Sequence, residues 1–416
     1  MAASDQASAV VFTGVRIFDG TGSEPFPGEV RIDGERITQV ARAAERVPRD
    51  GARIVESPGC VLMPGLVEAH AHLTWPTSVE RLVPGMFLPL EDLTLNAARN
   101  ARILLDHGFT SAYSAGALAP GVEVALAKHL DENAFPGPRL IPSTIEREPP
   151  GATDGFLATG AVEEHESGPE GVRAFVRAAA QSGVKAVKFL LNGENALSPG
   201  TSQKLTYSEE EVRAAGEQAR ESNVWLSAHA QAKDAIKFAI KHGFRVLYHC
   251  TYADAEAMDM LEAARDRIYV APSIGIMQAI LDTELPPFMD SEYQKGNAKE
   301  QLDLLSVLIP QLHKRGVKIL PGGDYGFPFN PNGRNAWDLE LWVRYFGFSP
   351  LEVLRAATEL GGEIMGLAGE LGLIKPGYLA DLLLVDGDPA CDVRILQDKA
   401  RLRGIMKAGA FHKDPV

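Results

Sequence analysis

Eight short apolar runs alternate with amphipathic segments through the middle of the chain, and this alternation constrains the fold most. The runs begin near residues 66, 108, 138, 186, 224, 245, 268 and 318. Helix-like segments separate them, among them EGVRAFVRAAAQSG, SEEEVRAAGEQARESN and AKDAIKFAIKHG. Eight strands, each followed by a helix or a long loop within roughly 250 residues, predict an α/β fold of the (β/α)8 TIM-barrel type. An open doubly wound sheet usually carries a glycine-rich phosphate loop after its first strand, and GLVEAH is not one.

The two ends of the chain have a different pattern. In the first sixty residues Val and Ile alternate with polar residues, and Gly or Asp-Gly marks the reversals, which is typical of short antiparallel strands. The pattern returns after about residue 371, in LGLIKPGYLADLLLVDGDP and LRGIMKAGAFHK. We therefore predict a small β-sandwich formed from residues 1–63 and 371–416, with the barrel over residues 64–370.

The composition of the 416 residues argues against several classes of partner. A net charge of -14 disfavours nucleic acid and anionic membranes, because phosphates attract an excess of Lys and Arg. No apolar run approaches the roughly 20 residues of a membrane helix, and MAASDQASAV lacks the features of a secretion signal. The three cysteines are far apart and odd in number, which implies no disulfide framework. We expect a cytoplasmic protein that acts on a small molecule.

Metal-type and acid–base residues gather at the ends of the predicted strands. Barrel active sites form at the carboxyl ends of the strands. Five of the eight strands end in such residues: His70 and His72, Lys188, His229, His249, and Asp324. His70 and His72 are two apart, so an extended strand projects both rings to one face. Imidazole nitrogen and carboxylate oxygen are good ligands for zinc or a similar divalent ion.

Each of these residues also has an ordinary structural explanation when taken singly. Two hydrogen-bonded histidines in a strand would explain His70 and His72, a salt bridge would explain Lys188, and the turn GGDYG would explain Asp324. Their joint occurrence favours a site. A lysine ammonium is not a metal ligand, but a lysine carboxylated by carbon dioxide becomes a carbamate that can bridge two metals. Two neighbouring metals can hold a hydroxide between them near neutral pH.

The ordered set His-x-His, Lys188, His229, His249 and Asp324 resembles the amidohydrolase superfamily in its binuclear form. The flanking segments VLMPGLVEAHAHL and SPLEVLRAAT…LGLIKPGYLADLLLVDGDP are similar too. The spacing in SAHAQAKDAIKFAIKHGFRVLYHC is most similar to imidazolonepropionase-like hydrolases, prolidases and Xaa-Arg dipeptidases, ochratoxin amidase, and phenylurea and molinate hydrolases.

This resemblance implies a ligand set and an assembly. His70, His72 and Asp324 would hold the more buried metal, and His229 and His249 the more exposed one. N6-carboxylysine at Lys188 would bridge two divalent ions, zinc being the first choice. A homo-oligomer is implied by the resemblance alone.

The expected reaction is hydrolysis of an amide-type C–N bond in an N-acyl amino acid, a dipeptide or an aryl amide. The bridging hydroxide would attack the carbonyl carbon, and Asp324 would take its proton and deliver it to the departing nitrogen. An aryl urea or carbamate is the alternative substrate. A deaminase is less favoured, because Lys188 is present and Gln231 stands where such enzymes have a glutamate. A non-catalytic scaffold would be expected to have lost ligands.

Loops after the strands supply the candidate substrate contacts, which are Trp75, Tyr113, Gln231, Tyr252, Tyr325, Phe327 and Arg334. Arg334 or Arg147 could hold a substrate carboxylate. Two departures from the family pattern bear on substrate identity. The stretch STIEREPPGATDGFLATG has no histidine where many members carry Gly-Gly-His, and GGDYG replaces the commoner Gly-Thr-Asp-Ala.

Overall fold

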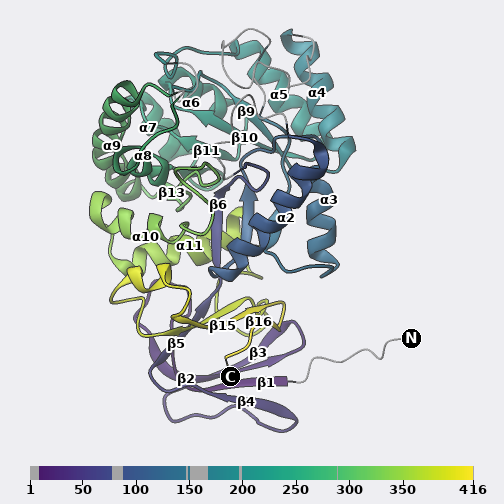
Figure 1. The fold of residues 1–416 in the computed structure, drawn as a ribbon, viewed down its shortest axis with the longest axis vertical. Coiled ribbons are helices and arrows are strands. Elements are labelled where there is room, and N and C mark those ends of the chain that lie inside the picture. The colour runs from purple at the N-terminus through teal and green to yellow at the C-terminus, as the bar shows by residue number, and fades with distance from the viewer. Residues whose placement is uncertain are drawn as a thin grey trace.

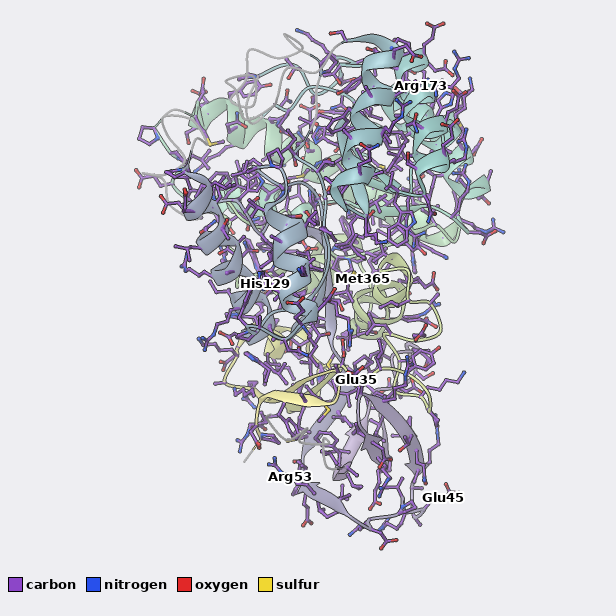
Figure 2. All side chains as sticks on the ribbon, turned by 90° about the vertical axis from the view of Figure 1, so that its right-hand side faces the viewer. Glu35, Glu45, Arg53, His129, Arg173 and Met365 are labelled. Atoms are coloured by element: carbon purple, nitrogen blue, oxygen red, sulfur yellow. The ribbon has the colours of Figure 1, made fainter. Side chains whose placement is uncertain are left out.

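The computed structural model describes residues 9–76, 88–146, 149, 167–195, 199–287 and 289–415. Its strands form three hydrogen-bonded sheets, of eight, five and three strands. The eight-stranded sheet lies at one end of the molecule, and the two smaller sheets lie among the helices (Figure 1). Figure 2 gives a side view in which Arg53 of the large sheet and Arg173 of α4 (Gly168–Ser182) lie toward opposite ends of the molecule.

All eight strands predicted for the middle of the chain are present, and every pairing among them is parallel. The three-stranded sheet contains β6 (Leu66–Ala71), β7 (Phe109–Ser114) and β8 (Arg139–Ile141). The five-stranded sheet contains β9 (Ala186–Leu190), β10 (Trp225–Ala230), β11 (Val246–His249), β12 (Tyr269–Ala271) and β13 (Lys318–Ile319). Isolated parallel bridges, Ser143 with Ala186 and Ala71 with Tyr325, join the two sheets. The carboxyl ends of all eight strands therefore face the same way.

Helices follow most of these strands and cover them with apolar faces. Besides α4, they are α2 (Leu90–Asp106), α3 (Val122–Asp131), α5 (Glu209–Ser222), α6 (Lys233–Lys241), α7 (Ala255–Ala263), α8 (Ile274–Asp282), α9 (Ser291–Lys314), α10 (Trp337–Leu341) and α11 (Pro350–Ile364). Helix α5 begins in a capping box: Ser208 Oγ accepts from the Glu211 N–H, and the Glu211 carboxylate accepts from the Ser208 N–H. None of the helices in the described ranges has the length and apolar character to cross a membrane.

Both ends of the chain build the eight-stranded sheet, as the repeated strand pattern predicted. The N-terminal strands are β1 (Ala9–Ile17), β2 (Phe26–Asp33), β3 (Arg36–Arg42), β4 (Ala52–Glu56) and β5 (Cys60–Pro64). The C-terminal strands are β14 (Leu382–Asp386), β15 (Leu402–Lys407) and β16 (Ala410–Lys413). The strand order is β16-β15-β14-β5-β1-β2-β3, with β4 also paired to β1. The join between the two ends is the antiparallel pair of β14 with β5.

The expectation of a wholly antiparallel unit was wrong, because β1 pairs in parallel with both β4 and β5. Phe12 of β1, Leu62 of β5 and Leu384 of β14 are buried in one apolar cluster. An alternating pattern fixes which face of a strand is buried but leaves the strand direction open. Direction is decided here by packing between segments that are far apart in the sequence.

Candidate active site

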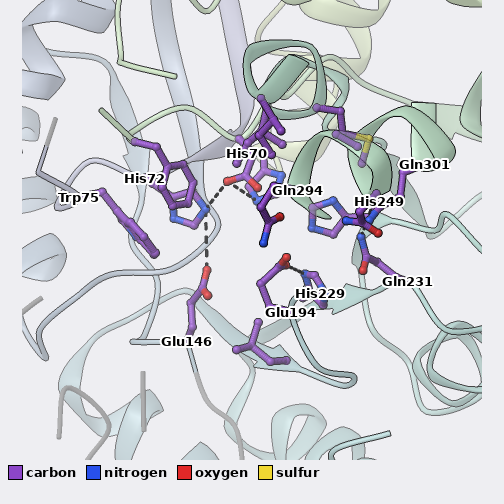
Figure 3. A pocket seen from close by; sticks show the side chains of 18 of the residues that line it. His70, His72, Trp75, Glu146, Glu194, His229, Gln231, His249, Gln294 and Gln301 are labelled. Carbon is purple, nitrogen blue, oxygen red and sulfur yellow. Dashed lines mark hydrogen bonds and ion pairs between the residues drawn. The ribbon is translucent and has the colours of Figure 1, made fainter. Parts of the chain in front are cut away.

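The six residues singled out from the sequence line one pocket at the carboxyl ends of the parallel strands. Figure 3 labels the four histidines among them. His70, Lys188, His229 and His249 lie on β6, β9, β10 and β11, while His72 and Asp324 come just after β6 and β13. All six side chains are buried. Positions spread over most of the chain thus meet because parallel strands present their ends at a single edge.

His70 and His72 each turn one ring nitrogen toward Asp324. The Nδ1 atom of His70 lies 2.7 Å from Ser273 Oγ, and that of His72 lies 3.1 Å from the Gly116 carbonyl oxygen. Their Nε2 atoms are 3.6 Å and 3.0 Å from Asp324 Oδ1. Each ring is therefore held from behind while its other nitrogen is left to the pocket, an arrangement typical of metal-binding histidines.

A second group lies around His229 and His249. Their ring centroids are 4.5 Å apart, and Glu194 Oε2 lies 3.3 Å from His229 Nδ1. One ligand-type atom from each of Glu194, His229 and His249 falls within 4.8 Å of the others. His70, His249 and Asp324 meet the same criterion. Two adjoining sets of metal-type donors thus share His249.

Lys188 lies deep in the pocket and its ammonium group is fully engaged. Nζ donates to the Ala115 carbonyl oxygen at 2.7 Å and to Glu146 Oε1 at 3.3 Å. It also lies 4.4 Å from the centroid of the Tyr248 ring, a cation–π contact. Glu146 Oε1 is in turn 3.8 Å from His72 Nε2. A carboxylate and a lysine therefore stand together beside the His70–His72 group.

Electrostatics keep three of the four imidazoles neutral. Burial lowers the pKa of His229 to about 3 and holds the pKa values of His70 and His249 well below the usual value, with neighbouring cations adding to the effect. Burial also opposes charge on His72, but the hydrogen bond and negative charge of Asp324 outweigh it and raise the His72 pKa. Neutral imidazole is the form that binds metal.

A layer of buried polar groups fixes the backbone beneath these side chains. The Glu68 carboxylate accepts from the His70 N–H and from Asn335 Nδ2, and burial raises the Glu68 pKa to about 8. Asn330 Nδ2 donates to the carbonyl oxygens of Gly323 and Asp324. Hydrogen bonds from residues outside the pocket thus hold the backbone at His70 and at Asp324.

Unusual backbone conformations cluster at the same place. Among the described residues other than glycine, eight have positive φ, and four of these follow or end β11, β12 and β13. They are His249 (71°), Cys250 (55°), Ser273 (61°) and Asp324 (61°). Such conformations cost about 1–3 kcal/mol each and persist where the surroundings impose them, which is common at functional sites.

The expected substrate contacts divide into two groups. Trp75, Gln231 and Phe327 line the pocket. Tyr113, Tyr252, Tyr325 and Arg334 are not among its described lining residues: Tyr113 is buried and stacks on Trp225, for example, and Arg334 lies over the Trp337 ring. Arg147 lies outside the described residues.

Sequence reasoning missed two carboxylates and one helix face. Glu146 and Glu194 line the pocket, and so do Gln294, Asn297, Ala298 and Gln301 of α9. Glu146 follows β8 closely, so its position near a strand end was a usable signal. The α9 residues share one helix face by their spacing, but nothing in their chemistry distinguished that face from an ordinary buried one.

The donor set fits a divalent metal. Buried His229 Nε2 and His249 Nδ1 have no hydrogen-bond partner in the described part of the chain, and Asp324 Oδ1 faces the His72 Nε2 atom at 3.0 Å. A buried polar atom without a partner costs about 1–3 kcal/mol, and a cation between these atoms would remove that cost. A parallel α/β fold with histidines and a carboxylate at its strand ends defines a metal-dependent class of enzyme.

Comparison with known proteins identifies the family. The amidohydrolase family pattern matches residues 61–411, and the chain therefore belongs to the amidohydrolase family. Membership supports an enzyme that hydrolyses amide bonds. Ochratoxinase from Aspergillus niger is 26% identical over 443 aligned positions, covering 100% of this chain and 89% of the relative.

Solved structures agree on the fold. A Xaa-Pro dipeptidase crystallised with methionine in its active site matches with a TM-score of 0.86 at 22% identity, covering 98% of this chain and 100% of that one. Phenylurea hydrolase B matches with a TM-score of 0.75 at 20% identity, covering 97% and 96%. At these identities the likeness establishes a shared α/β architecture.

Proposed function

We propose that this chain hydrolyses an amide-type C–N bond in a small molecule with an aromatic or amino-acid part. The observation that carries the proposal is the convergence of four histidines, Lys188 and Asp324 in one buried pocket of an amidohydrolase-family chain. Sequence similarity to an ochratoxinase supports it. An aryl urea or carbamate is the alternative substrate. The structural likeness to phenylurea hydrolase B is the reason to test this alternative.

Two divalent ions, zinc being the first choice, are proposed as cofactors. His70, His72 and Asp324 would hold one ion, His229 and His249 the other, and a carboxylated Lys188 would lie between them. When bound, such ions polarise a carbonyl group and lower the pKa of water toward neutrality. Carboxylation of Lys188 would require its Nζ to give up the present ion pair with Glu146.

Asp324 is the proposed catalytic acid and base. Its Oδ1 lies in the pocket, 3.6 Å and 3.0 Å from the Nε2 atoms of His70 and His72. The carboxylate can take a proton from the attacking water and pass it to the departing nitrogen. Asn330 fixes the Asp324 backbone, so the carboxylate stays in place through both transfers.

The pocket walls favour a substrate with a flat apolar group. The ring centroids of Trp75 and Phe327 are 4.6 Å apart, and both rings line the pocket. The pocket is also lined by three apolar residues of α8, Ile276, Met277 and Ile280. Lys188 is the one cationic side chain among the described lining residues apart from histidine, and Glu146 pairs with it. Recognition of a substrate carboxylate by arginine is therefore not supported by the described walls.

The same proposal includes the arrangement of the chain. The eight parallel strands would close into one (β/α)8 barrel over residues 64–370, with a small β-sandwich from 1–63 and 371–416. The two bridges between the parallel sheets support closure, and the β14–β5 pair supports a unit made from both ends. We also propose a cytoplasmic homo-oligomer.

A hydrolysis screen tests the function. N-acyl amino acids, dipeptides, aryl amides and phenylureas would be offered to the zinc-loaded protein and to the same protein after chelation. We expect turnover of at least one aryl amide or aromatic N-acyl amino acid, and loss of that turnover after chelation. Turnover confined to phenylureas would favour the alternative, and inactivity toward all four classes would count against the proposal.

A further inference from the structure

Glu194 is a carboxylate in the pocket to which neither the sequence pattern nor the family comparison assigns a role. We propose that Glu194 is a direct protein ligand of the metal ion held by His229 and His249. The inference rests on the proposed function only in requiring that this ion binds. It adds a carboxylate to a site for which two imidazoles and the carboxylated Lys188 were expected.

The first argument is geometric. Glu194 Oε2 is 3.3 Å from His229 Nδ1, and ligand-type atoms of Glu194, His229 and His249 lie within 4.8 Å of one another. Donors about 2.1 Å from one ion are separated by no more than about 4.2 Å. A shift of less than about 1 Å therefore brings all three atoms onto one ion. Figure 3 shows Glu194 reaching into the pocket beside His229.

The second argument comes from the buried atoms around Glu194. His229 and His249 are 2% and 4% exposed, and each has one ring nitrogen without a hydrogen-bond partner. An imidazole binds metal as a neutral ring, so neither residue contributes negative charge to balance a divalent ion. Asp324 is grouped with His70 and His249 instead. A carboxylate from Glu194 would add negative charge at this ion beside that of the carboxylated Lys188 proposed above.

The third argument is that the backbone carrying Glu194 is anchored on both sides. Before it, the Gly193 N–H donates to the Lys204 carbonyl oxygen at 3.0 Å. After it, Asn195 Oδ1 accepts from the N–H groups of Thr201 and Ser202, and Asn195 Nδ2 donates to Asn297 of α9. A side chain presented from so constrained a segment is positioned before any metal arrives, which favours binding.

The test compares metal binding in Glu194→Gln and in a matched control, Glu300→Gln. Glu300 is exposed on α9. Its charge, like that of Glu194, raises the pKa of Tyr252, so the two carboxylates affect the same neighbour. We expect two zinc ions per wild-type chain by elemental analysis and chelator competition. In Glu194→Gln the first ion should bind as before, and the Kd of the second should rise at least about tenfold. Glu300→Gln should match the wild type.

A second variant separates ligation from a role in which Glu194 merely orients His229. In Glu194→Cys loaded with cobalt, a thiolate on the metal gives a sulfur-to-cobalt charge-transfer band in the near ultraviolet. We expect that band in Glu194→Cys and not in wild type or Glu300→Cys. The band would support ligation, and a cobalt d–d spectrum of Glu194→Gln identical to that of the wild type at equal cobalt content would overturn the inference.

The outcomes distinguish the inference from the proposed function. Wild-type protein that binds two ions, with both affinities unchanged in Glu194→Gln, would overturn the role of Glu194 and leave the proposed function standing. Wild-type protein that binds no divalent ion would overturn both.

Discussion

Lys188 and Glu146 form an ion pair inside the pocket, with Nζ and Oε1 3.3 Å apart and both side chains largely buried. The sequence pattern singled out the lysine alone. Removal of one member of a buried pair leaves the other without compensation. The pair therefore couples the stability of the metal-free protein to the residues of the site.

Replacing Glu146 with Gln should destabilise the metal-free protein by about 3 kcal/mol, the lower end for breaking a buried pair. Denaturant unfolding of chelator-treated protein measures the change, with Glu300→Gln as the exposed control. Equal midpoints for wild type and Glu146→Gln would contradict a stabilising pair.

Replacing Asp324 with Asn should lower kcat at least ~100-fold, because the amide cannot shuttle a proton. Asparagine keeps one oxygen that can bind a metal, so we expect the metal content to stay near the wild-type value. Steady-state kinetics and elemental analysis on the same sample check both points. Turnover near that of wild type at full metal content would rule out the proton-transfer role.

Removal of metal should abolish turnover and lower stability. A ligand that binds only the folded state at 100 times its Kd contributes about 2.7 kcal/mol. Thermal unfolding of chelated and zinc-reconstituted protein should show a higher Tm with zinc, together with recovered activity. Full activity after exhaustive chelation would argue against metal-dependent hydrolysis.

Truncation of Trp75 should weaken substrate binding, whereas truncation of Arg334 should not. Trp75 lines the pocket beside Phe327, and Arg334 stacks on Trp337 outside the described lining. Trp75→Ala should therefore raise KM for an aryl substrate by about tenfold or more, equal to about 1.4 kcal/mol. A larger KM effect from Arg334→Ala would instead indicate a carboxylate-binding arginine.

The buried carboxyl of Glu123 should make stability depend on pH. Burial raises its pKa to about 7, while its Oε2 accepts from the Ser143 N–H. An acid whose folded pKa is raised binds its proton more tightly when folded, so stability should fall between about pH 4.5 and pH 7. Glu123→Gln cannot ionise and should remove that part of the fall, about 3 kcal/mol at pH 8. Identical pH profiles of unfolding would contradict this.

The sequence by itself determined the eight middle strands and the six residues at their ends. Alternating apolar runs and amphipathic segments are local signals in the sequence. Parallel strands of one sheet place their carboxyl ends at the same edge, independently of the conformation of the connecting loops. His70 and Asp324 could therefore be predicted to share a site although they come from opposite ends of that region. The alternating strand pattern at both ends of the chain is also a local signal, so the sequence could predict that both ends contribute strands to one sheet.

Only the tertiary structure decided what surrounds those residues. Glu146 and Glu194 enter the pocket from loops, and the face of α9 enters from a helix far along the chain. The parallel pairing of β1 with β4 and β5 likewise had no local signal. In each case the outcome depends on contacts between distant segments, which burial and hydrogen bonding settle collectively. A periodic pattern records which face of an element is buried, and not which neighbour buries it.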